Sequence, residues 1–226
     1  MQHRPGLPPR SPGSDLSPGD TGLQLLENAA ATAAALVAII LAVGPVSGAH
    51  LNPVVTLADR IFGGLDTPTG GAYMAAKVAG GALGTVVANL MFDLPAIEWS
   101  STERSSGGLW LAEVVATFGL LLVVYGVVRS GRARVAPFAV GAYIGGAYFF
   151  TASTSFANPA VTLARTLSDT FAGIEPASVP AFVLARTRRL SRDTLVTFTA
   201  PSVTIAGQRL SAAGSTGPAD GALRWT

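Results

Sequence analysis

The chain has 226 residues, a mean hydropathy of +0.46 and only 12% charged residues, against roughly 25% in soluble domains, which indicates a membrane protein. Its net charge of +2 is too small to indicate a nucleic-acid partner, and the lack of cysteine excludes disulfides and zinc–thiolate sites. With two histidines, His3 and His50, little material is left for a catalytic site, a metal centre or a bound cofactor, and we expect none of these.

Four long segments along the chain carry at most one charge each, at 23–45, 70–92, 109–128 and 135–150. A helix needs about 20 mostly apolar residues to cross a bilayer, and the first three segments reach that length. The fourth reaches it if its helix continues to Ala152 or Ser153. Helices of a soluble domain would show a charged face, so we predict membrane-spanning helices in contact with the lipid bilayer.

Small, basic and aromatic residues inside these segments each predict a structural feature. Small residues recur at a spacing of four, as in Gly80 with Gly84 and Gly141 with Gly145, which lets helices approach closely in lipid. We expect Lys77 near a helix end, with its ammonium reaching toward the membrane surface. We expect an interfacial and packing belt, rather than a substrate cage, from the aromatic residues of the fourth segment: Tyr143, Tyr148, Phe149 and Phe150.

Charges in the loops predict the orientation of the chain. The loop after the third segment carries Arg129, Arg132 and Arg134 and no acidic residue, whereas 93–108 carries three acidic residues and one arginine. Because arginine-rich loops stay on the cytoplasmic side, we place the first of these loops inside and the second outside. The chain would then be a multi-pass protein of the plasma (inner) membrane.

The string Asn-Pro-x-Val-Thr-Leu-Ala occurs twice, beginning at Asn52 and, 106 residues later, at Asn158. An odd number of predicted crossings separates the two copies, so they enter the membrane from opposite faces. Such an inverted repeat is typical of transporter folds with a site near the bilayer midplane. Because proline suits the first turn of a helix, each copy predicts a short helix that begins after its asparagine and is too brief to span.

Two short helices that enter from opposite faces bring their N-termini together near the bilayer centre. Their dipoles concentrate positive potential at the meeting point, where Asn52 and Asn158 offer side-chain amide donors. A neutral hydrogen-bonding solute passes such a point, whereas a cation or a relayed proton meets an electrostatic barrier. The repeat therefore predicts a passive pore whose partners are small neutral solutes.

Across residues 23–185 the chain resembles the aquaporin (major intrinsic protein) family. The two copies are similar to the paired NPA boxes of that family, the first with valine in place of alanine: Asn52, Pro53, Val54, Asn158, Pro159 and Ala160. The resemblance implies an all-α membrane fold of six helices and two half-helices, normally a homotetramer with one pore in each subunit. It also implies supporting roles for His50, which braces the first box, for Glu113, which holds the second through backbone N–H groups, and for Thr117.

The resemblance further implies a selectivity filter built from small side chains. Most of the family carries arginine directly after the second box, and here that position is Val161. Counting from the boxes places the other filter positions at Thr32, Gly146 and Ser155. A wide filter without arginine resembles the bacterial aquaglyceroporins associated with arsenic resistance, which implies glycerol- or arsenite-type solutes as well as water. Arg165 lies one turn further along and is not assumed to replace the missing arginine.

The offset of 106 residues also predicts helices that the two ends of the sequence do not provide. Positions 3–22 hold five prolines and four glycines, and Arg186 begins a run of four arginines in seven residues. We therefore expect the first and sixth helices of the family fold to be missing or incomplete, beside disordered tails at 1–22 and 186–226. Either the ends are genuine or the reading frame is altered at both. The alternative to a working channel is a non-conducting fragment that assembles only with intact subunits.

Overall fold

The computed structural model describes residue 17 and residues 19–187, 204–205 and 208–209. The regular secondary structure of these residues is helical apart from two two-residue strands, β1 (Thr204–Ile205) and β2 (Gln208–Arg209), which pair antiparallel. The predicted all-α class is confirmed. The helices are α2 (Thr21–Ser47), α3 (Pro53–Phe62), α4 (Thr67–Met91), α5 (Gly107–Arg129), the 3₁₀ helix η1 (Ala133–Val135), α6 (Ala136–Phe150), α7 (Pro159–Ala164), the 3₁₀ helices η2 (Arg165–Leu167) and η3 (Pro176–Ser178), and α8 (Val179–Thr187).

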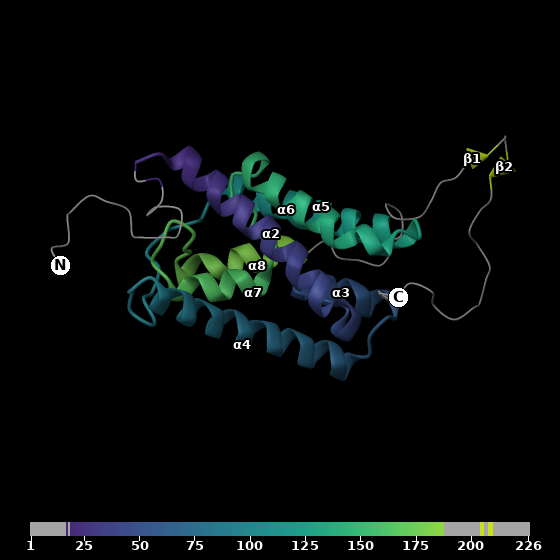
Figure 1. Cartoon of the computed structure of the whole chain (residues 1–226), viewed down its shortest axis with the longest axis horizontal. Helices are drawn as coiled ribbons and strands as arrows, with labels where there is room; N and C mark the ends of the chain where they lie inside the picture. The colour runs from purple at the N-terminus through teal and green to yellow at the C-terminus, as the bar shows by residue number, and fades with distance from the viewer. Residues whose placement is uncertain (1–16, 18, 188–203, 206–207, 210–226) are drawn as a thin grey trace.

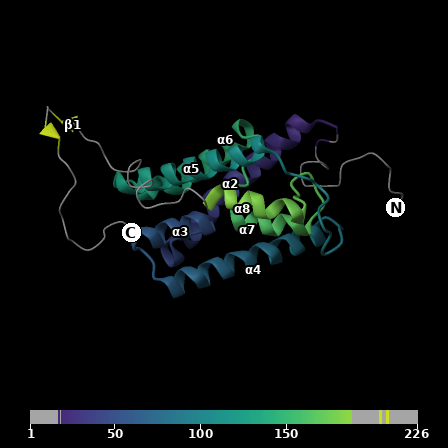
Figure 2. The ribbon, with the colours of Figure 1, turned by 180° about the vertical axis from the view of Figure 1, so that it is seen from behind.

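The long helices surround the short ones. Figure 1 shows α5 and α6 along one side of the bundle and α4 along the opposite side, with α3, α7 and α8 between them and α2 crossing over the short helices. Figure 2 shows the same arrangement from behind. α2 packs against α6, α6 against α5, and α4 against both α3 and α7. The two repeated strings, far apart in the sequence, thus come into contact inside the bundle.

Three of the predicted spans are confirmed as helices that are long and apolar enough to cross a membrane. These are α2, α4 and α5, with 27, 25 and 23 residues. The residue just before each helix is an N-cap, whose side chain accepts a hydrogen bond from a backbone N–H of the first turn. These N-caps are Asp20 for α2, Asp66 for α4 and Ser106 for α5. Such caps satisfy donors that have no partner within the helix, so polar residues just before each apolar segment define where the helices start.

The fourth predicted segment, 135–150, forms α6. This helix has 15 residues and ends at Phe150, so it does not continue to Ala152 or Ser153, as the length of a full span would require. The Thr151 hydroxyl oxygen accepts a hydrogen bond from the backbone N–H of Ser155 at 3.0 Å, and Thr154 and Ser155 adopt positive φ values of 56° and 49°. Because these conformations cannot continue a right-handed helix, the chain turns directly after α6 and leads into α7.

Glycines on α6 let α2 approach closely. A Cβ atom added to Gly141 would lie 2.9 Å from the Ala33 carbonyl oxygen, and one added to Gly145 would lie 3.1 Å from the Ala33 Cβ. Gly80 and Gly84 on α4 have nothing within 4 Å of the corresponding position. Of these two glycine pairs, the pair on α6 therefore forms a helix contact, and the pair on α4 forms none with the part of the chain that the structure describes.

The structure corrects the prediction for Lys77. This residue lies well inside α4 rather than near its end, and its ammonium donates a hydrogen bond to the Thr56 hydroxyl on α3. It also lies 4.9 Å from the centre of the Tyr73 ring, within the range of a cation–π contact. The ammonium thus turns toward the short helix α3.

The predicted tails, 1–22 and 186–226, lie mostly outside the described residues. Within them, α2 already begins at Thr21 and α8 continues to Thr187. Positions 3–22, to which the repeat maps the first family helix, also lie largely outside the described residues. α8 has nine residues where the structure describes it, which is fewer than a membrane crossing needs.

Candidate functional site

Each repeated string folds into a short helix that starts directly after its asparagine. The Asn52 side-chain oxygen accepts a hydrogen bond from the Val54 N–H at 2.9 Å and so caps α3. The Asn158 oxygen caps α7 by accepting from the N–H groups of Ala160 at 3.0 Å and Val161 at 3.3 Å. A proline follows each asparagine in the first turn, where a helix requires no backbone donor.

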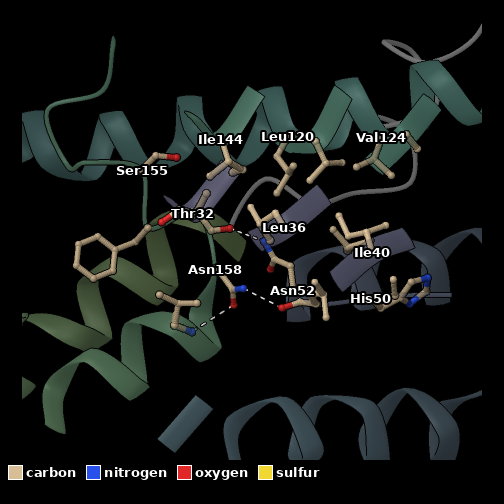
Figure 3. Close-up of a pocket in the computed structure, with 18 of the residues that line it drawn as sticks. Thr32, Leu36, Ile40, His50, Asn52, Leu120, Val124, Ile144, Ser155 and Asn158 are labelled. Carbon is tan, nitrogen blue, oxygen red and sulfur yellow. Dashed lines mark hydrogen bonds between the residues drawn. The ribbon is translucent and has the colours of Figure 1, made fainter. Parts of the chain in front are cut away.

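The two asparagines also join the tips of the short helices. The Asn52 side-chain nitrogen donates to the Ala157 carbonyl at 2.6 Å, and the Asn158 nitrogen donates to the Leu51 carbonyl at 2.9 Å. Figure 3 shows the two side chains next to each other. Each asparagine thus uses its oxygen for its own helix and its nitrogen for the other repeat. Because a carboxamide nitrogen carries two protons, each keeps one donor beyond these contacts.

A cavity of about 170 Å³ extends past this junction. It lies between α2, α5 and α6 on one side and the loops that lead into α3 and α7 on the other. Much of its wall is apolar and comes from the long helices: Leu36, Ile40, Leu120, Val124, Val140 and Ile144. A wall of this kind repels no uncharged solute and offers few competing hydrogen bonds.

The polar groups of the cavity lie at separate levels along it. Figure 3 shows Thr32 and Ser155 toward one end, Asn52 and Asn158 near the middle, and His50 toward the other end. All five side chains belong to residues that line the cavity. A solute that crosses the cavity therefore meets polar partners in succession, separated by apolar wall.

Glu113 holds the loop that leads into α7. It is fully buried in α5, and its two carboxylate oxygens accept hydrogen bonds from the backbone N–H groups of Phe156 at 3.1 Å and Ala157 at 2.9 Å. Ala157 adopts a φ of 45°, a left-handed conformation that is uncommon for a residue other than glycine. The carboxylate thereby stabilises the turn that directs the Ala157 carbonyl toward Asn52.

His50 and Thr117 are the other two residues with expected supporting roles. His50 is buried on the cavity wall, with its Nε2 atom 4.0 Å from the Asp59 carboxylate and its ring edge-on to Tyr73 at 5.9 Å between centroids. Thr117 is buried one turn after Glu113, and within the described residues its hydroxyl has no hydrogen-bond partner. The structure thus places His50 on the cavity wall, and it places Thr117 in α5 away from that wall.

Three of the four predicted filter positions line the cavity: Thr32, Ser155 and Val161. Figure 3 shows Thr32 and Ser155 toward one end of it. The prediction for Gly146 is wrong, because this residue is exposed on α6 and lies outside the cavity wall. Ile144 and Tyr148 form the wall instead. Gly146 is two residues from each of them, and two residues correspond to a rotation of about 200° around a helix.

Tyr148, expected from the sequence in an interfacial and packing belt, lines the cavity instead. Its side chain is only 4% exposed, and its hydroxyl lies 3.1 Å from the Thr32 hydroxyl. Phe149 and Phe150, by contrast, are more than half exposed, as a belt requires. The spacing of four from Ile144 is the sequence signal that could have found Tyr148, since residues four apart share a helix face.

Arg165 also reaches this end of the cavity. Its Nη2 atom donates to the Tyr148 hydroxyl at 3.3 Å, and its guanidinium carbon lies 4.5 Å from the centre of the Phe156 ring. Arg165 lies four residues after Val161, so the same periodicity directs its side chain to the side of α7 on which Val161 lies. The spacing of four thus indicates that Arg165 and Val161 share a side of the helix, but only the fold shows that the arginine reaches the cavity.

Two short helices that meet tip to tip through their asparagine caps, among helices of membrane length and beside a lined cavity, define a membrane channel with an inverted repeat. Residues 13–167, more than half of the chain, match the family model described as major intrinsic protein, and the chain belongs to that family. The predicted resemblance is confirmed. The chain is thus a multi-pass membrane protein of a family of channels for water and small solutes, and it is not an enzyme.

Individual relatives agree with this assignment. The chain is 47% identical over 172 residues to the aquaglyceroporin AqpS of Rhizobium meliloti (strain 1021), which covers 76% of this chain and 73% of that protein. It is 37% identical over 135 residues to the aquaporin NIP1-3 of Oryza sativa subsp. japonica, covering 57% of this chain and 47% of the relative. It is 36% identical over 107 residues to a probable NIP-type aquaporin of Nicotiana alata, covering 46% of this chain and 40% of the relative. The chain thus spans less than half the length of the two plant relatives.

Proposed function

We propose that the chain forms a passive transmembrane pore for small uncharged solutes of the glycerol or arsenite type, as well as for water. The observation that carries this proposal is the reciprocal pair of hydrogen bonds made by Asn52 and Asn158. These bonds hold both residues on the wall of one cavity. A solute in the cavity would exchange its bonds to water for bonds to an amide from each half of the repeat.

The two half-helices support the exclusion of cations and relayed protons. α3 and α7 both begin at the asparagine junction, so the positive ends of their dipoles point at the same part of the cavity. Asn52 and Asn158 add donors there, which suit the lone pairs of a neutral oxygen. A cation at this point is repelled by the positive ends of the two helix dipoles. A water molecule there accepts hydrogen bonds from the asparagines, and this orientation prevents it from passing a proton along a chain of waters.

The cavity wall supports solutes that are larger and less polar than water. Leu36, Leu120 and Ile144 give it a broad apolar surface, and Val161 stands where most of the family carries arginine. A carbon chain packs against such a wall at little desolvation cost. The relative from Rhizobium meliloti is named an aquaglyceroporin, which agrees with this choice of solute.

We further propose that residues 23–185 form the channel domain and that four copies assemble in the plasma (inner) membrane, each with its own pore. The outer surfaces of the long helices support contact with lipid or with neighbouring copies, because large apolar side chains are exposed there: Leu41, Leu83, Leu90, Met91, Leu111 and Phe138. Exposed apolar area of this kind marks a membrane or protein interface.

A second candidate is a subunit that conducts only within an assembly. A further cavity of about 780 Å³ opens beside the pore, between α2, α4 and α7, and His50, Leu51 and Asn158 are among the residues that line it. Asn158 therefore lines both cavities. A continuous pore wall at this level requires a helix over that side, and another subunit could supply it.

Stopped-flow measurements on proteoliposomes test both candidates. We expect glycerol and arsenite uptake above that of protein-free liposomes, and Asn158→Asp should reduce this uptake at least about tenfold. Aspartate keeps the cap of α7 but loses the donor to Leu51 and adds negative charge at the junction. Arg129→Lys, an exposed position at the far end of α5, should match the unchanged chain.

Two outcomes of this experiment would contradict the proposal in different ways. Fast water flux without glycerol or arsenite flux would refute the class of solute. Absence of all flux from the folded, reconstituted protein would refute the independent pore and leave the second candidate. That candidate in turn requires flux above that of a six-helix channel of the same family alone when the chain is reconstituted together with that channel.

A further inference from the structure

The end of the cavity opposite His50 gathers polar side chains from four separate segments. Thr32 comes from α2, Tyr148 from α6, Ser155 from the loop before α7, and Arg165 from the start of η2. Figure 3 shows Thr32 and Ser155 at this end, apart from the two asparagines. We name these four residues the polar end of the cavity.

Arg165 is anchored in the polar end at two points. One arm of its guanidinium donates to the Tyr148 hydroxyl at 3.3 Å, and its planar group lies over the Phe156 ring at 4.5 Å. Phe156 is itself held, because its backbone N–H donates to the Glu113 carboxylate. The five N–H donors of a guanidinium lie in one rigid plane, so holding one arm also sets the direction of the other.

Val161 and Arg165 both line this cavity. Val161 lies four residues before Arg165, and it is the Arg165 guanidinium that bonds the Tyr148 hydroxyl. The sequence alone suggests a filter without arginine, because position 161 is valine. The structure corrects this expectation, since a guanidinium from the next turn enters the same end of the cavity.

Two donors of the polar end have no hydrogen-bond partner among the residues that the structure describes. They are the Arg165 Nη1 atom and the Ser155 hydroxyl. The Ser155 side chain is 96% buried, being 4% exposed, and both residues line the cavity. Buried polar groups in native proteins are almost always paired with protein, water or ligand, so these two donors are available to a group that carries oxygen.

We propose that Arg165 and Ser155 form a binding site for compact solutes with at least two hydroxyl groups, and that Arg165 determines the specificity of the pore for them. One solute oxygen accepts from Arg165 Nη1. A second hydroxyl bonds to Ser155, which can both donate and accept after rotation about a single bond. The apolar wall at Leu120 and Ile144 faces the carbon side of the solute. The inference rests on the proposed function, because it assigns a site within that pore.

The first test compares Arg165→Lys with the unchanged chain in stopped-flow experiments that report the ratio of glycerol to water permeability. Lysine keeps the positive charge, but one ammonium cannot hold Tyr148 and the solute with the geometry of a fork. We expect the ratio to fall roughly tenfold, which corresponds to the loss of one charge-assisted hydrogen bond. Ser155→Ala should lower the ratio about threefold, and Arg129→Lys should leave it unchanged.

A second measurement does not depend on flux. Glycerol should raise the Tm of the detergent-solubilised unchanged chain more than it raises the Tm of Arg165→Lys, because the variant lacks one of the two contacts. An unaltered permeability ratio in Arg165→Lys, or equal glycerol-dependent shifts in Tm, would overturn the site. If the unchanged chain conducts no solute, the proposed pore fails, and the shifts in Tm alone decide whether this site binds polyols.

Discussion

Glu113 shows how a single buried side chain can position half of the pore. Its carboxylate accepts two backbone N–H donors and so stabilises the left-handed turn at Ala157, whose carbonyl in turn accepts from Asn52. The equivalent loop before α3 is braced differently, since Leu51 N–H donates to the Ala49 carbonyl at 2.7 Å. The two repeats therefore reach the same asparagine contact through different local bonds.

We expect Glu113→Gln to lower the Tm of the detergent-solubilised protein and to reduce solute flux. The substitution replaces one acceptor with an NH₂ group that faces a backbone donor, and each lost bond to a charged group removes about 1.5–3 kcal/mol of stability. Thermal unfolding measures the effect, with Glu103→Gln in an exposed loop as the control. A Tm equal to that of the unchanged chain would show that the two bonds do not support the loop.

Contacts between helices set the position of the half-helices. α4 lies against α7 so closely that a Cβ atom on Gly81 would be 3.3 Å from the Ala164 Cβ, and Lys77 on the same helix bonds Thr56 on α3. On the other side of the cavity, α2 meets α6 at Gly141 and Gly145. The wall thus depends on glycines at the helix contacts, where the lack of a side chain lets the backbones approach closely. Such close packing is needed because lipid supplies no hydrophobic force between helices.

We expect alanine to destabilise the protein at Gly141 but not at Gly80. At Gly141 the new methyl group meets the Ala33 carbonyl at 2.9 Å, and such overpacking lowers stability by about 1–3 kcal/mol. At Gly80 it meets nothing within 4 Å, so the higher helix propensity of alanine should be neutral or slightly stabilising. Thermal unfolding of the two variants compares them directly. Equal values of Tm would contradict the close contact between α2 and α6.

The assembled bundle leaves one side of the asparagine junction next to a second cavity. α4 packs on α3 and α7, while α2 packs mainly on α6, and the cavity lies between these two groups. Tyr73 on α4 bridges to the Ser47 carbonyl of α2 at 3.0 Å. The pore wall is thus closed by packed helices on the side of α5 and α6 and by fewer contacts on the side of α4.

We expect the purified protein to be a tetramer in mild detergent. Apolar side chains exposed on the outer helices favour contact with other copies, and such contact would also shield the side of the second cavity. Size-exclusion chromatography with light scattering should give a protein mass about four times the 22.9 kDa of one chain. A protein mass of a single chain at all concentrations would exclude the tetramer.

Several parts of the site could be predicted because they depend on local chemistry. Asn52 and Asn158 each precede a proline and a helix-forming string, so their capping role follows from residue type and spacing. The partners of their side-chain nitrogens did not follow, because Leu51 and Ala157 lie in the opposite repeat. Glu113 was found through resemblance to a family, since a lone acidic residue in an apolar segment does not reveal its partner.

The wrong prediction at Gly146 has a different origin. Counting from the boxes along the sequence identifies a position on α6, but not the rotation of that helix about its axis. Gly141 and Gly145 set this rotation by facing α2, and Ile144 and Tyr148 then face the cavity. Lys77 was misplaced for a similar reason, because Thr56 becomes its neighbour only when α3 folds back against α4.

Residue type and spacing along the chain were sufficient for the membrane class, the three long spans, the two half-helices and the family, because each follows from interactions between residues close in sequence or from transfer into lipid. The wall of the cavity, the entry of Arg165 into its polar end and the partner of Lys77 required the folded protein. These features depend on how helices from distant parts of the sequence rotate against one another, and that rotation is decided by side-chain packing and not by local pattern.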